Sequence, residues 1–315
     1  MGYGINGHVG ICFQQSLGTA FTSSFHYMNM LSESLVETKN PIVREHLKGR
    51  YSDSGILEGF NTIAGDIVMQ AHPILIGKIL KAWCGQSSSG GPSGLSYTHT
   101  FKPRNADWDE KSALPPMTIE VYRGAGSAHQ YYDCVADGIN INIAHGAIVS
   151  VTMSVIGGKF SKVAKRTPTF QTGNEFTFDQ ASITLGGTAT DKLTSLVISG
   201  KNNVEAKGTL NAAKTAARIR RTGFRLIEIS GALLYEDDTE LDKARAFTEA
   251  RLFCTLSQGG SNYITFDFPS FEYTSFPVNI GGPGTVEVSF AGRANYNAGS
   301  ATEATFILVN SHSIY

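Results

Sequence analysis

Residue types that could perform chemistry are present in this chain, but few of them are spaced as a catalytic or cofactor site requires. Gly2, Gly4 and Gly7 match by letter the G-x-G-x-x-G fingerprint of dinucleotide-binding proteins. That motif holds a pyrophosphate only where a strand precedes it and a helix follows it. Because these glycines open the sequence with no strand before them, we expect a flexible arm here rather than a nucleotide site.

The metal-ligating and nucleophilic residues are scattered along the sequence. None of the eight histidines forms the H-x-H or H-E-x-x-H spacing that sets two imidazoles on one metal ion. The sequence has no G-x-S-x-G nucleophile elbow. We therefore expect no enzyme activity, no metal and no cofactor. The four cysteines are too sparse for a disulfide framework, and we expect free, mostly buried thiols at Cys12, Cys84, Cys134 and Cys254.

One acidic run, Asp107-Trp108-Asp109-Glu110, offers a carboxylate pair or a fragment of a calcium loop. Arg104 and Lys111 flank it, which favours a solvated loop over a site. His99 and Trp108 lie in the same part of the sequence and would form a small-molecule pocket if they converged.

The strongest charge feature lies between residues 201 and 225, where seven basic residues accompany one acidic residue, Glu205. Such an arm would bind nucleic acid or an acidic protein surface, or would simply be a solvated loop. An acidic segment, residues 236–242, follows closely, so protein–protein or local pairing is favoured over nucleic acid. We predict that this basic arm docks on a neighbouring subunit. Its residues are Lys201, Lys207, Lys214, Arg218, Arg220, Arg221 and Arg225.

Composition places the chain among globular proteins. Its 315 residues are 41% hydrophobic and 17% charged, enough for two domains with cores of ordinary size. The net charge of −1 gives no general attraction for phosphate. We find no signal-peptide pattern and no apolar run of about 20 residues, so we expect no membrane anchor and expect assembly in the cytoplasm.

A stretch near the middle of the sequence recurs near its end at a constant offset (278 − 141 = 137). Each copy alternates apolar and polar residues around a short glycine-containing break, which predicts a half-buried β-hairpin. The first copy is residues 141–143 with 149–153, and the second is residues 278–280 with 286–290. Self-similarity of this kind indicates a fold that was built twice.

Weaker matches extend the repeat upstream, where residues 63–68 resemble 229–234 and residues 36–39 resemble 204–207. These matches predict two units, residues 1–160 and residues 170–315. The first carries a Gly/Ser-rich insertion at about 85–116, whose composition is that of a loop.

Alternating runs rich in β-branched and aromatic residues predict strands through most of the chain. One helix is expected in each unit, over residues 73–83 and over residues 239–256, the second capped by Asp238 or Thr239. The first would place Ile76, Ile79, Leu80 and Trp83 on one apolar face. The predicted fold is mainly β (α+β), with two tandem antiparallel β-sandwich or half-barrel units, each flanked by one helix.

Seven segments carry a resemblance to a known family: 25–27 (FHY), 31–35 (LSESL), 65–67 (GDI), 73–80 (PILIGKIL), 132–134 (YDC), 149–159 (VSVTMSVIGGK) and 286–292 (VEVSFAG). In this order they resemble the tail tube (major tail) proteins of long-tailed bacteriophages, in a duplicated-domain form. The likeness spans nearly the whole chain.

The resemblance implies a structural protein of the virion tail. Six units of this type close a ring, and rings stack into a hollow tube around the tape-measure protein that later conducts DNA. With two units per chain, a homotrimeric pseudo-hexameric ring is favoured over a homohexamer. The implied partners are further copies of the chain, the tape-measure protein, and the tail terminator and distal tail proteins. DNA would be met only in non-specific transit.

The resemblance also gives roles to particular segments. The loops over residues 32–58 and 200–224 would reach adjacent subunits or rings. A neutral or acidic lumen would let DNA slide without binding. The polar alternates that we take as lumen candidates are Ser150, Thr152, Ser154, Glu287 and Ser289.

Two alternatives stay open at this point. The first is another self-assembling β-protein, such as a capsid decoration protein or the tube of an injection machine. The second is a carbohydrate-binding or hydrolytic β-sandwich, which would need clustered aromatic residues and a carboxylate pair, and Trp108 with Asp109 is the one hint of such a site.

Overall fold

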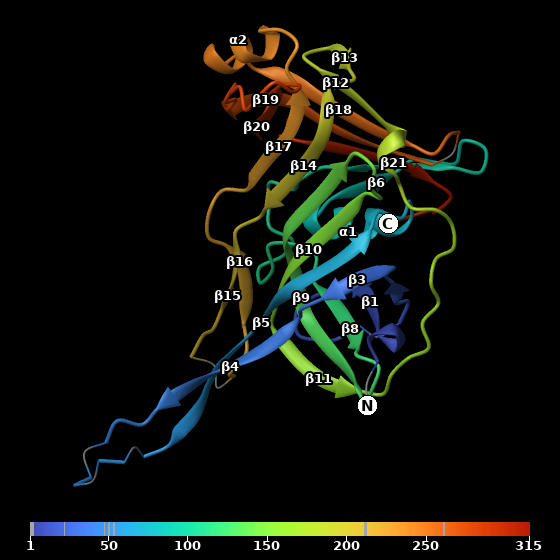
Figure 1. The fold of residues 1–315 in the computed structure, drawn as a ribbon. Helices are drawn as coiled ribbons and strands as arrows, with labels where there is room; N and C mark the ends of the chain where they lie inside the picture. Colours follow the sequence, from blue (N-terminus) through green and yellow to red (C-terminus); the bar gives the residue numbers. More distant parts are fainter. Residues whose placement is uncertain are drawn as a thin grey trace.

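The computed structural model describes residues 3–21, 23–46, 48–49, 51–52, 54–210, 213–260 and 262–315. Within these residues the fold is mainly β, with two α-helices, and every pairing between its named strands is antiparallel. The predicted fold class, mainly β and antiparallel, is confirmed. Figure 1 shows the second half of the chain above the first, with one long hairpin that projects away from the body.

The first half contains one helix among short and long strands. After the 3₁₀ turn η1 (Gly4–Asn6), its elements are β1 (His8–Phe13), β2 (His26–Tyr27), β3 (Met30–Glu33), β4 (Val36–Val43), β5 (Ile56–Gln70), α1 (Leu75–Cys84), β6 (Ser87–Ser89), β7 (Tyr97–Phe101), β8 (Met117–Tyr122), β9 (Ala128–Ala144), β10 (Ser150–Gly157) and β11 (Lys159–Val163).

The second half has a similar succession. Its elements are η2 (Phe178–Gln180), β12 (Ala181–Leu185), β13 (Thr188–Thr190), β14 (Leu193–Lys201), β15 (Val204–Lys207), β16 (Arg218–Arg221), β17 (Leu226–Leu234), α2 (Thr239–Arg245), β18 (Ala250–Ser257), β19 (Tyr263–Ser275), β20 (Glu287–Ala294) and β21 (Thr305–Asn310).

One long strand organises each half. The first part of β9 lies between β8 and β11, and its second part pairs with β10, which in turn pairs with β5. In the second half, β19 lies between β18 and β21 and then pairs with β20, which pairs with β17. The outer pairings β1–β8 and β12–β18 also correspond. Strand order is therefore the same in both halves.

The two long strands also bend at corresponding places. In the β9–β10 ladder, Val155 pairs with Ala136 and Ser154 pairs with Gly138, so one residue of β9 is left over in a bulge. In the β19–β20 ladder, Gly292 pairs with Tyr273 and Ala291 pairs with Ser275, which leaves over one residue of β19. A β-bulge bends its strand and turns it toward another sheet. The two bulges are 137 residues apart in the sequence, which is the offset of the sequence repeat.

The second copy of the repeated hairpin differs from the first beyond this bulge. β9 continues to Ala144 and pairs with β10, so the predicted hairpin is confirmed for residues 141–153. β19 ends at Ser275, and residues 278–280 belong to no strand. The hairpin prediction for the second copy is wrong for the isolated chain.

The predicted helix is confirmed in the first half and is only partly correct in the second. α1 buries Ile76, Ile79, Leu80 and Trp83, as predicted. α2 ends at Arg245, and the predicted helix over residues 239–256 is wrong for its second part, where β18 lies. β18 is a strand because its burial has a period of two: Leu252, Cys254 and Leu256 face the core, and the residues between them do not. Asp238 occupies the N-cap position without a side-chain cap, while a carboxylate oxygen of Asp237 accepts a hydrogen bond from the Thr239 amide at 2.9 Å.

The insertion at residues 85–116 is not a loop throughout, as its composition had indicated. It contains β6 and β7, and β7 pairs along its length with β21 from the other half of the chain. Phe101 and His99 of β7 are fully buried. A direct pairing of β9 with β14 also joins the halves, with Ile141 opposite Ile198. One continuous hydrophobic core runs through both halves as a result.

Trp83 of α1 fills the space between the halves. Its indole lies over Gly200 of β14, where an added Cβ would stand 2.2 Å from the ring, and it meets the Phe306 ring of β21 edge-on at 6.2 Å. Glycine at position 200 is thus a packing requirement of the junction between α1 and β14.

We predict that Gly200→Ala destabilises the chain by roughly 1–3 kcal/mol, because the new methyl group must displace a buried indole. Urea unfolding followed by tryptophan fluorescence measures the loss. The matched control is Gly91→Ala, since a Cβ at Gly91 meets no atom within 4 Å. Equal stability of the Gly200→Ala variant and the wild-type chain would contradict this description of the junction.

Candidate assembly surfaces

The predicted basic arm is a β-hairpin that continues the β14–β17 pair. It begins at the end of β14, runs through β15 and β16, and returns into β17. Its seven basic side chains divide into two groups by their surroundings. Arg220, Arg221 and Arg225 are turned toward the insertion between α1 and β8, and the other four lie along the exposed side of the hairpin.

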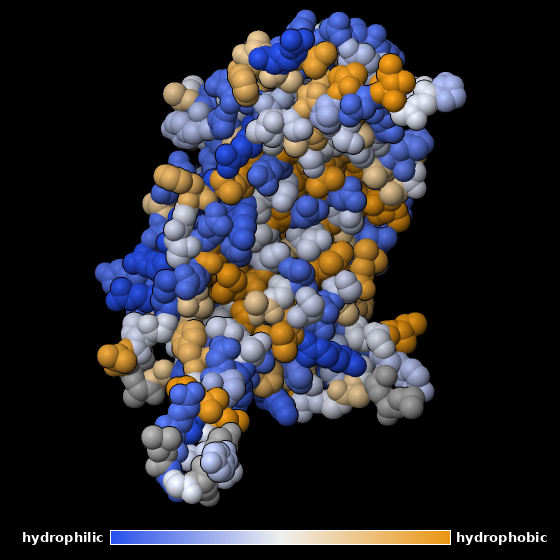
Figure 2. All heavy atoms as spheres, turned by 60° about the vertical axis from the view of Figure 1, so that its left-hand side comes forward, coloured by the Kyte–Doolittle hydropathy of each residue, from blue (hydrophilic) through white to orange (hydrophobic). Residues whose placement is uncertain are grey.

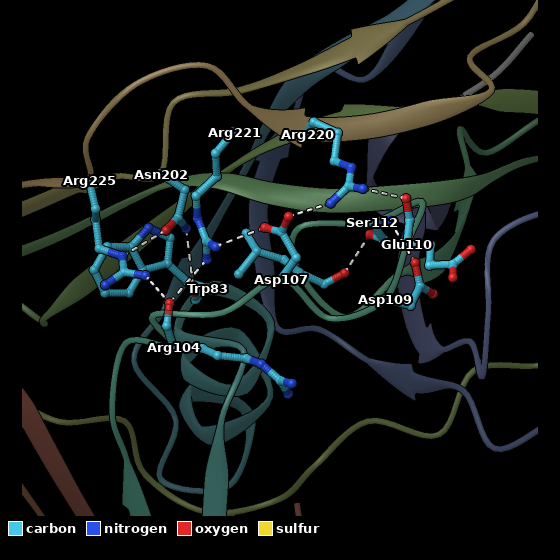
Figure 3. Close-up of polar contacts among 11 residues, drawn as sticks. Trp83, Arg104, Asp107, Asp109, Glu110, Ser112, Asn202, Arg220, Arg221 and Arg225 are labelled. Atoms are coloured by element: carbon cyan, nitrogen blue, oxygen red, sulfur yellow. Dashed lines mark hydrogen bonds and ion pairs between the residues drawn. The ribbon is translucent and has the colours of Figure 1, made fainter.

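Asp107 of the insertion holds two arginines of the arm, as Figure 3 shows. Arg220 forms an ion pair with one oxygen of the Asp107 carboxylate, and Arg221 binds the other at 3.2 Å. Arg221 also donates to the Arg104 carbonyl at 3.2 Å. Burial lowers the pKa of Arg221, and the charge of nearby Arg225 lowers it further. The Asp107 carboxylate therefore compensates a guanidinium that has lost much of its water.

Arg225 closes the base of the arm. It forms an ion pair with Glu303, and its Nε donates to the Asn202 side chain at 3.0 Å. Asn202 is fully buried and donates in turn to the Trp83 carbonyl at 3.0 Å and the Ala136 carbonyl at 3.2 Å. The arm is thus connected by hydrogen bonds to α1 and β9, so its base is fixed in position.

The remaining basic residues lie toward solvent. Lys207 pairs with Glu205 at 2.5 Å, and Lys214 pairs with Glu58 of β5 at 2.9 Å. Hydrogen bonds from Lys214 and Lys39 lower the pKa of Glu58 to about 2. In the part of the chain that the structure describes, the side chains of Lys201 and Arg218 make no hydrogen bond or ion pair.

These contacts locate the acidic partners of the arm. We expected local pairing with residues 236–242, but Lys192 binds Glu236 and Asp237 instead. The acids that bind the arm within the chain are Asp107, Glu303, Glu205 and Glu58. Sequence reasoning missed Asp107 and Glu303 because each lies more than seventy residues away from its arginine. Docking of the arm on a neighbouring subunit remains a prediction.

The hairpin of β4 and β5 is exposed along β4 and at the start of β5. It projects from the body in Figure 1, beside β15 and β16. The Asn61 amide donates to the Lys214 carbonyl at 2.7 Å, which joins the two hairpins. Exposed apolar side chains, between 45% and 65% accessible, lie along the hairpin at Val36, Ile42, Val43, Ile56 and Leu57. Figure 2 shows hydrophobic spheres among hydrophilic ones near its base.

Exposed apolar side chains gathered on one element mark an interaction surface. The sequence had suggested a loop over residues 32–58 that reaches neighbours, and the structure gives it the form of a strand pair.

The lumen candidates lie on a broad polar sheet face. In β10, Ser150, Thr152 and Ser154 are partly exposed, whereas the residues between them are buried. In β20, Glu287 and Ser289 are exposed and Val288 is buried. Cross-strand partners share one face of a sheet. One row of partners runs through Ser150, Asn142, Val197, Ser230 and Ala291 of β10, β9, β14, β17 and β20.

The face is nearly neutral as well as polar. The next row runs through Thr152, Asn140, Ser199, Glu228 and Arg293. Glu287 accepts a hydrogen bond from the Thr194 hydroxyl at its border. The charged side chains in the paired rows, which together carry two net negative charges, are Asp66, Lys201, Glu228, Glu272, Glu287 and Arg293. The structure therefore brings all five lumen candidates to the same face of one sheet.

The other chemical motifs have structural explanations. Gly2 lies outside the described residues, and residues 4–6 form a 3₁₀ turn that leads into β1 rather than a helix. Asp109 accepts hydrogen bonds from the amides of Lys111 and Ser112, both at 2.7 Å, which closes a turn. No group of three or more histidine, cysteine or acidic side chains in the described residues could hold a metal ion.

His99 and Trp108, which the sequence leaves open as the sides of a pocket, have separate surroundings. His99 is buried against Tyr315 and Ser89, while Trp108 lies under the Arg104 guanidinium at 5.5 Å. Trp108 and Asp109 accordingly lack the aromatic cluster of a sugar site. All four cysteines are free and buried, and burial raises the pKa of the Cys12 thiol to about 11. None of the helices in the described residues is long and apolar enough to cross a membrane.

We predict that Asp107→Ala destabilises the chain by about 1–2 kcal/mol, because it leaves the half-buried Arg221 without its carboxylate. Amides of β16 should exchange faster, above all that of Ile219, which donates to the Lys111 carbonyl at 2.8 Å. Hydrogen–deuterium exchange with denaturant unfolding measures both effects. Glu205→Ala is the control, since its pair with Lys207 is exposed and should contribute less than about 1 kcal/mol. A loss no larger than the control's would refute the anchoring role of Asp107.

A protein-family model described as phage tail tube protein matches residues 4–294 of the chain. A search of curated proteins finds no match.

Proposed function

The chain belongs to the phage tail tube protein family, and from this premise we propose that it polymerises as stacked rings into the hollow tube that conducts DNA out of the virion. The protein is a structural component of the phage tail and not an enzyme. The observation that carries the proposal is the continuous sheet through β5, β10, β9, β14, β17 and β20, packed on one face and polar on the other.

A sheet of this kind suits the wall of a DNA conduit. Its inner face would be made of serine, asparagine and other small side chains, with the core and both helices behind it. DNA carries one negative charge per about 1.7 Å, and each cationic contact would hold it in place by releasing counterions. A face with a small net negative charge offers little to bind phosphate. We assign Ser150, Thr152, Ser154, Glu287 and Ser289 to the lumen on this ground.

The matching strand order of the two halves supports a duplicated fold with units at residues 1–160 and 170–315. Each half would then occupy one of six equivalent positions in the ring. Three chains supply six positions, so we propose a homotrimeric, pseudo-hexameric ring and place a homohexamer second. Assembly in the bacterial cytoplasm, around a tape-measure protein and between distal tail and terminator proteins, follows from this role.

The projecting hairpin of β4 and β5 is suited to joining rings. Its exposed apolar side chains need a cover, and the hairpin extends beyond the body of the subunit. The basic arm lies beside it and presents Arg218, whose side chain has no partner in the described chain, while Lys201 at its base belongs to the polar face of β14. We propose that hairpin and arm together contact a neighbouring subunit, the hairpin through apolar burial and the arm through charge.

We predict that the purified, untagged protein forms hollow tubes of stacked rings as its concentration rises, visible by negative-stain electron microscopy. Ile42→Lys with Val43→Lys should raise the concentration needed for tubes by about tenfold or more, because burying each apolar side chain is worth about 1.5–3 kcal/mol. Ile42→Leu with Val43→Leu keeps the apolar surface and should assemble normally. A wild-type chain that stays monomeric with nucleating tail proteins present would refute the proposed function.

The lumen assignment has its own test. We predict that Glu287→Lys lowers DNA delivery by particles whose tails are of normal length and number, since the new cation attracts phosphate inside the tube. Titre per particle measures the effect. Glu249→Lys makes the same charge change in the loop after α2, where Glu249 is exposed, and should leave the titre unchanged. Unimpaired delivery by the Glu287→Lys particles would weigh against a lumen position.

A further inference from the structure

One strand position in the second half is unoccupied in the isolated chain. In the first half, β9 beyond its bulge lies between two neighbours, so that Ile141 pairs with Val151 on one side and Ile198 on the other. The corresponding residues of the second half, 276–281, form no strand. Residues 287–290 of β20 pair with β17 and have no strand on their other side within the described chain.

Residues 276–281 have the sequence of the missing strand. Val278, Asn279 and Ile280 stand where Ile141, Asn142 and Ile143 stand in the first half. Ile280 is 83% exposed, although its counterpart Ile143 is 4% exposed. An isoleucine in solvent beside an open strand edge indicates a segment whose cover lies outside the chain.

Pro277 explains why this strand does not form alone. At the repeat offset of 137 residues, Pro277 corresponds to Asn140 of β9. Because proline has no N–H, a strand at residues 276–281 has one hydrogen-bond donor fewer than β9 has. In the first half, β14 covers the outer edge of β9 and supplies a second set of hydrogen bonds. The second half lacks that outer neighbour.

The first half of the chain contains the counterpart of β14. Gly65 of β5 lies against Ser34, where an added Cβ would stand 2.5 Å from the Ser34 carbonyl oxygen. Gly231 of β17 lies in the same way against Ser195, at 2.3 Å from its carbonyl oxygen. The next residues, Leu35 and Leu196, are each 1% exposed. These contacts align residues 34–39 with residues 195–200 of β14. The match of residues 36–39 with residues 204–207 that the sequence predicts is therefore wrong, because residues 204–207 form β15 of the arm.

The outer edge of this counterpart carries no strand. At Leu35, just before β4, the amide donates to the Glu33 carboxylate at 3.0 Å and the carbonyl accepts from the Tyr131 hydroxyl at 3.0 Å, so a strand that docks here replaces these side-chain contacts. β4 pairs with β5 on one side, and no strand in the described chain pairs with its other side. Each copy thus carries an open edge at β4 and a strand without an outer neighbour at residues 276–281. The internal β9–β14 pairing shows how two such elements fit together.

We propose that residues 276–281 form a β-strand on assembly, pairing with β20 of their own chain and with the β4 edge of a second copy. This inference rests on the proposed ring and names the contact that closes it. The register follows from the internal junction, in which Asn142 pairs with Val197. Asn279 would accordingly lie opposite Val36 of the adjacent copy, and both side chains are exposed in the isolated chain.

Disulfide trapping tests the register. The variant Val36→Cys with Asn279→Cys is assembled into tubes and treated with a mild oxidant. On a non-reducing denaturing gel it should give disulfide-linked dimers and trimers, with the closed trimer as the largest product. Each single variant should stay monomeric on that gel, because the four native cysteines are buried. Val36→Cys with Gly284→Cys, which moves one thiol five residues along the chain and out of the proposed strand, should link much less.

The outcomes separate this inference from the proposed function. Tubes of the double variant without cross-linked chains would overturn the inference and leave the tube function standing. If wild-type protein forms no tubes, the proposed function fails and the inference fails with it. If only the double variant fails to assemble, hydrogen–deuterium exchange of wild-type tubes decides. Amides of Val278 to Ile280 should exchange at least tenfold more slowly in tubes than in the free chain, and unchanged exchange would overturn the inference.

Discussion

The backbone hydrogen bonds at the edges of the sheets are the constraint on which the rest of this structure depends. An open edge carries unpaired N–H and C=O groups that will pair with any available strand. Within the chain, the β9–β14 pairing satisfies one such pair of edges and makes a single sheet from two halves. That pairing also places Gly200 against Trp83. The basic arm begins directly after it, and the side-chain amide of Asn202 donates hydrogen bonds to carbonyls of α1 and β9 that fix the base of the arm.

The two faces of this sheet have different physical tasks. The core-facing residues of β10, β14 and β20 pack with α1, and their burial stabilises the subunit. The outward residues are small, polar and nearly balanced in charge, which leaves the face hydrated. The proposed tube needs both properties, since its wall must be rigid while its bore must not bind the DNA that passes. Separating them by strand alternation lets one sheet serve both needs.

Much of this fold could be predicted from local sequence pattern. Helix α1 followed from four apolar residues at helical spacing, and the exposure of Ser150, Thr152 and Ser154 followed from strict alternation. Long-range contacts could not be predicted in this way. The partners of Arg220 and Arg225 are set by tertiary packing. The short apolar run of β18 fits the period of a helix as well as that of a strand, so sequence pattern alone does not distinguish the two there. Residues 278–280 have the pattern of a strand and no neighbour to pair with, which no local pattern reveals.

The central claim is that the two halves of the chain occupy equivalent positions in one closed sheet. A cryo-electron microscopy reconstruction of wild-type tubes tests this claim most directly. Our account predicts rings of three chains, in which the polar face of β10 and that of β20 both line the bore and strand order repeats six times around it. Rings of six chains, with one half of every chain outside the wall, would contradict it.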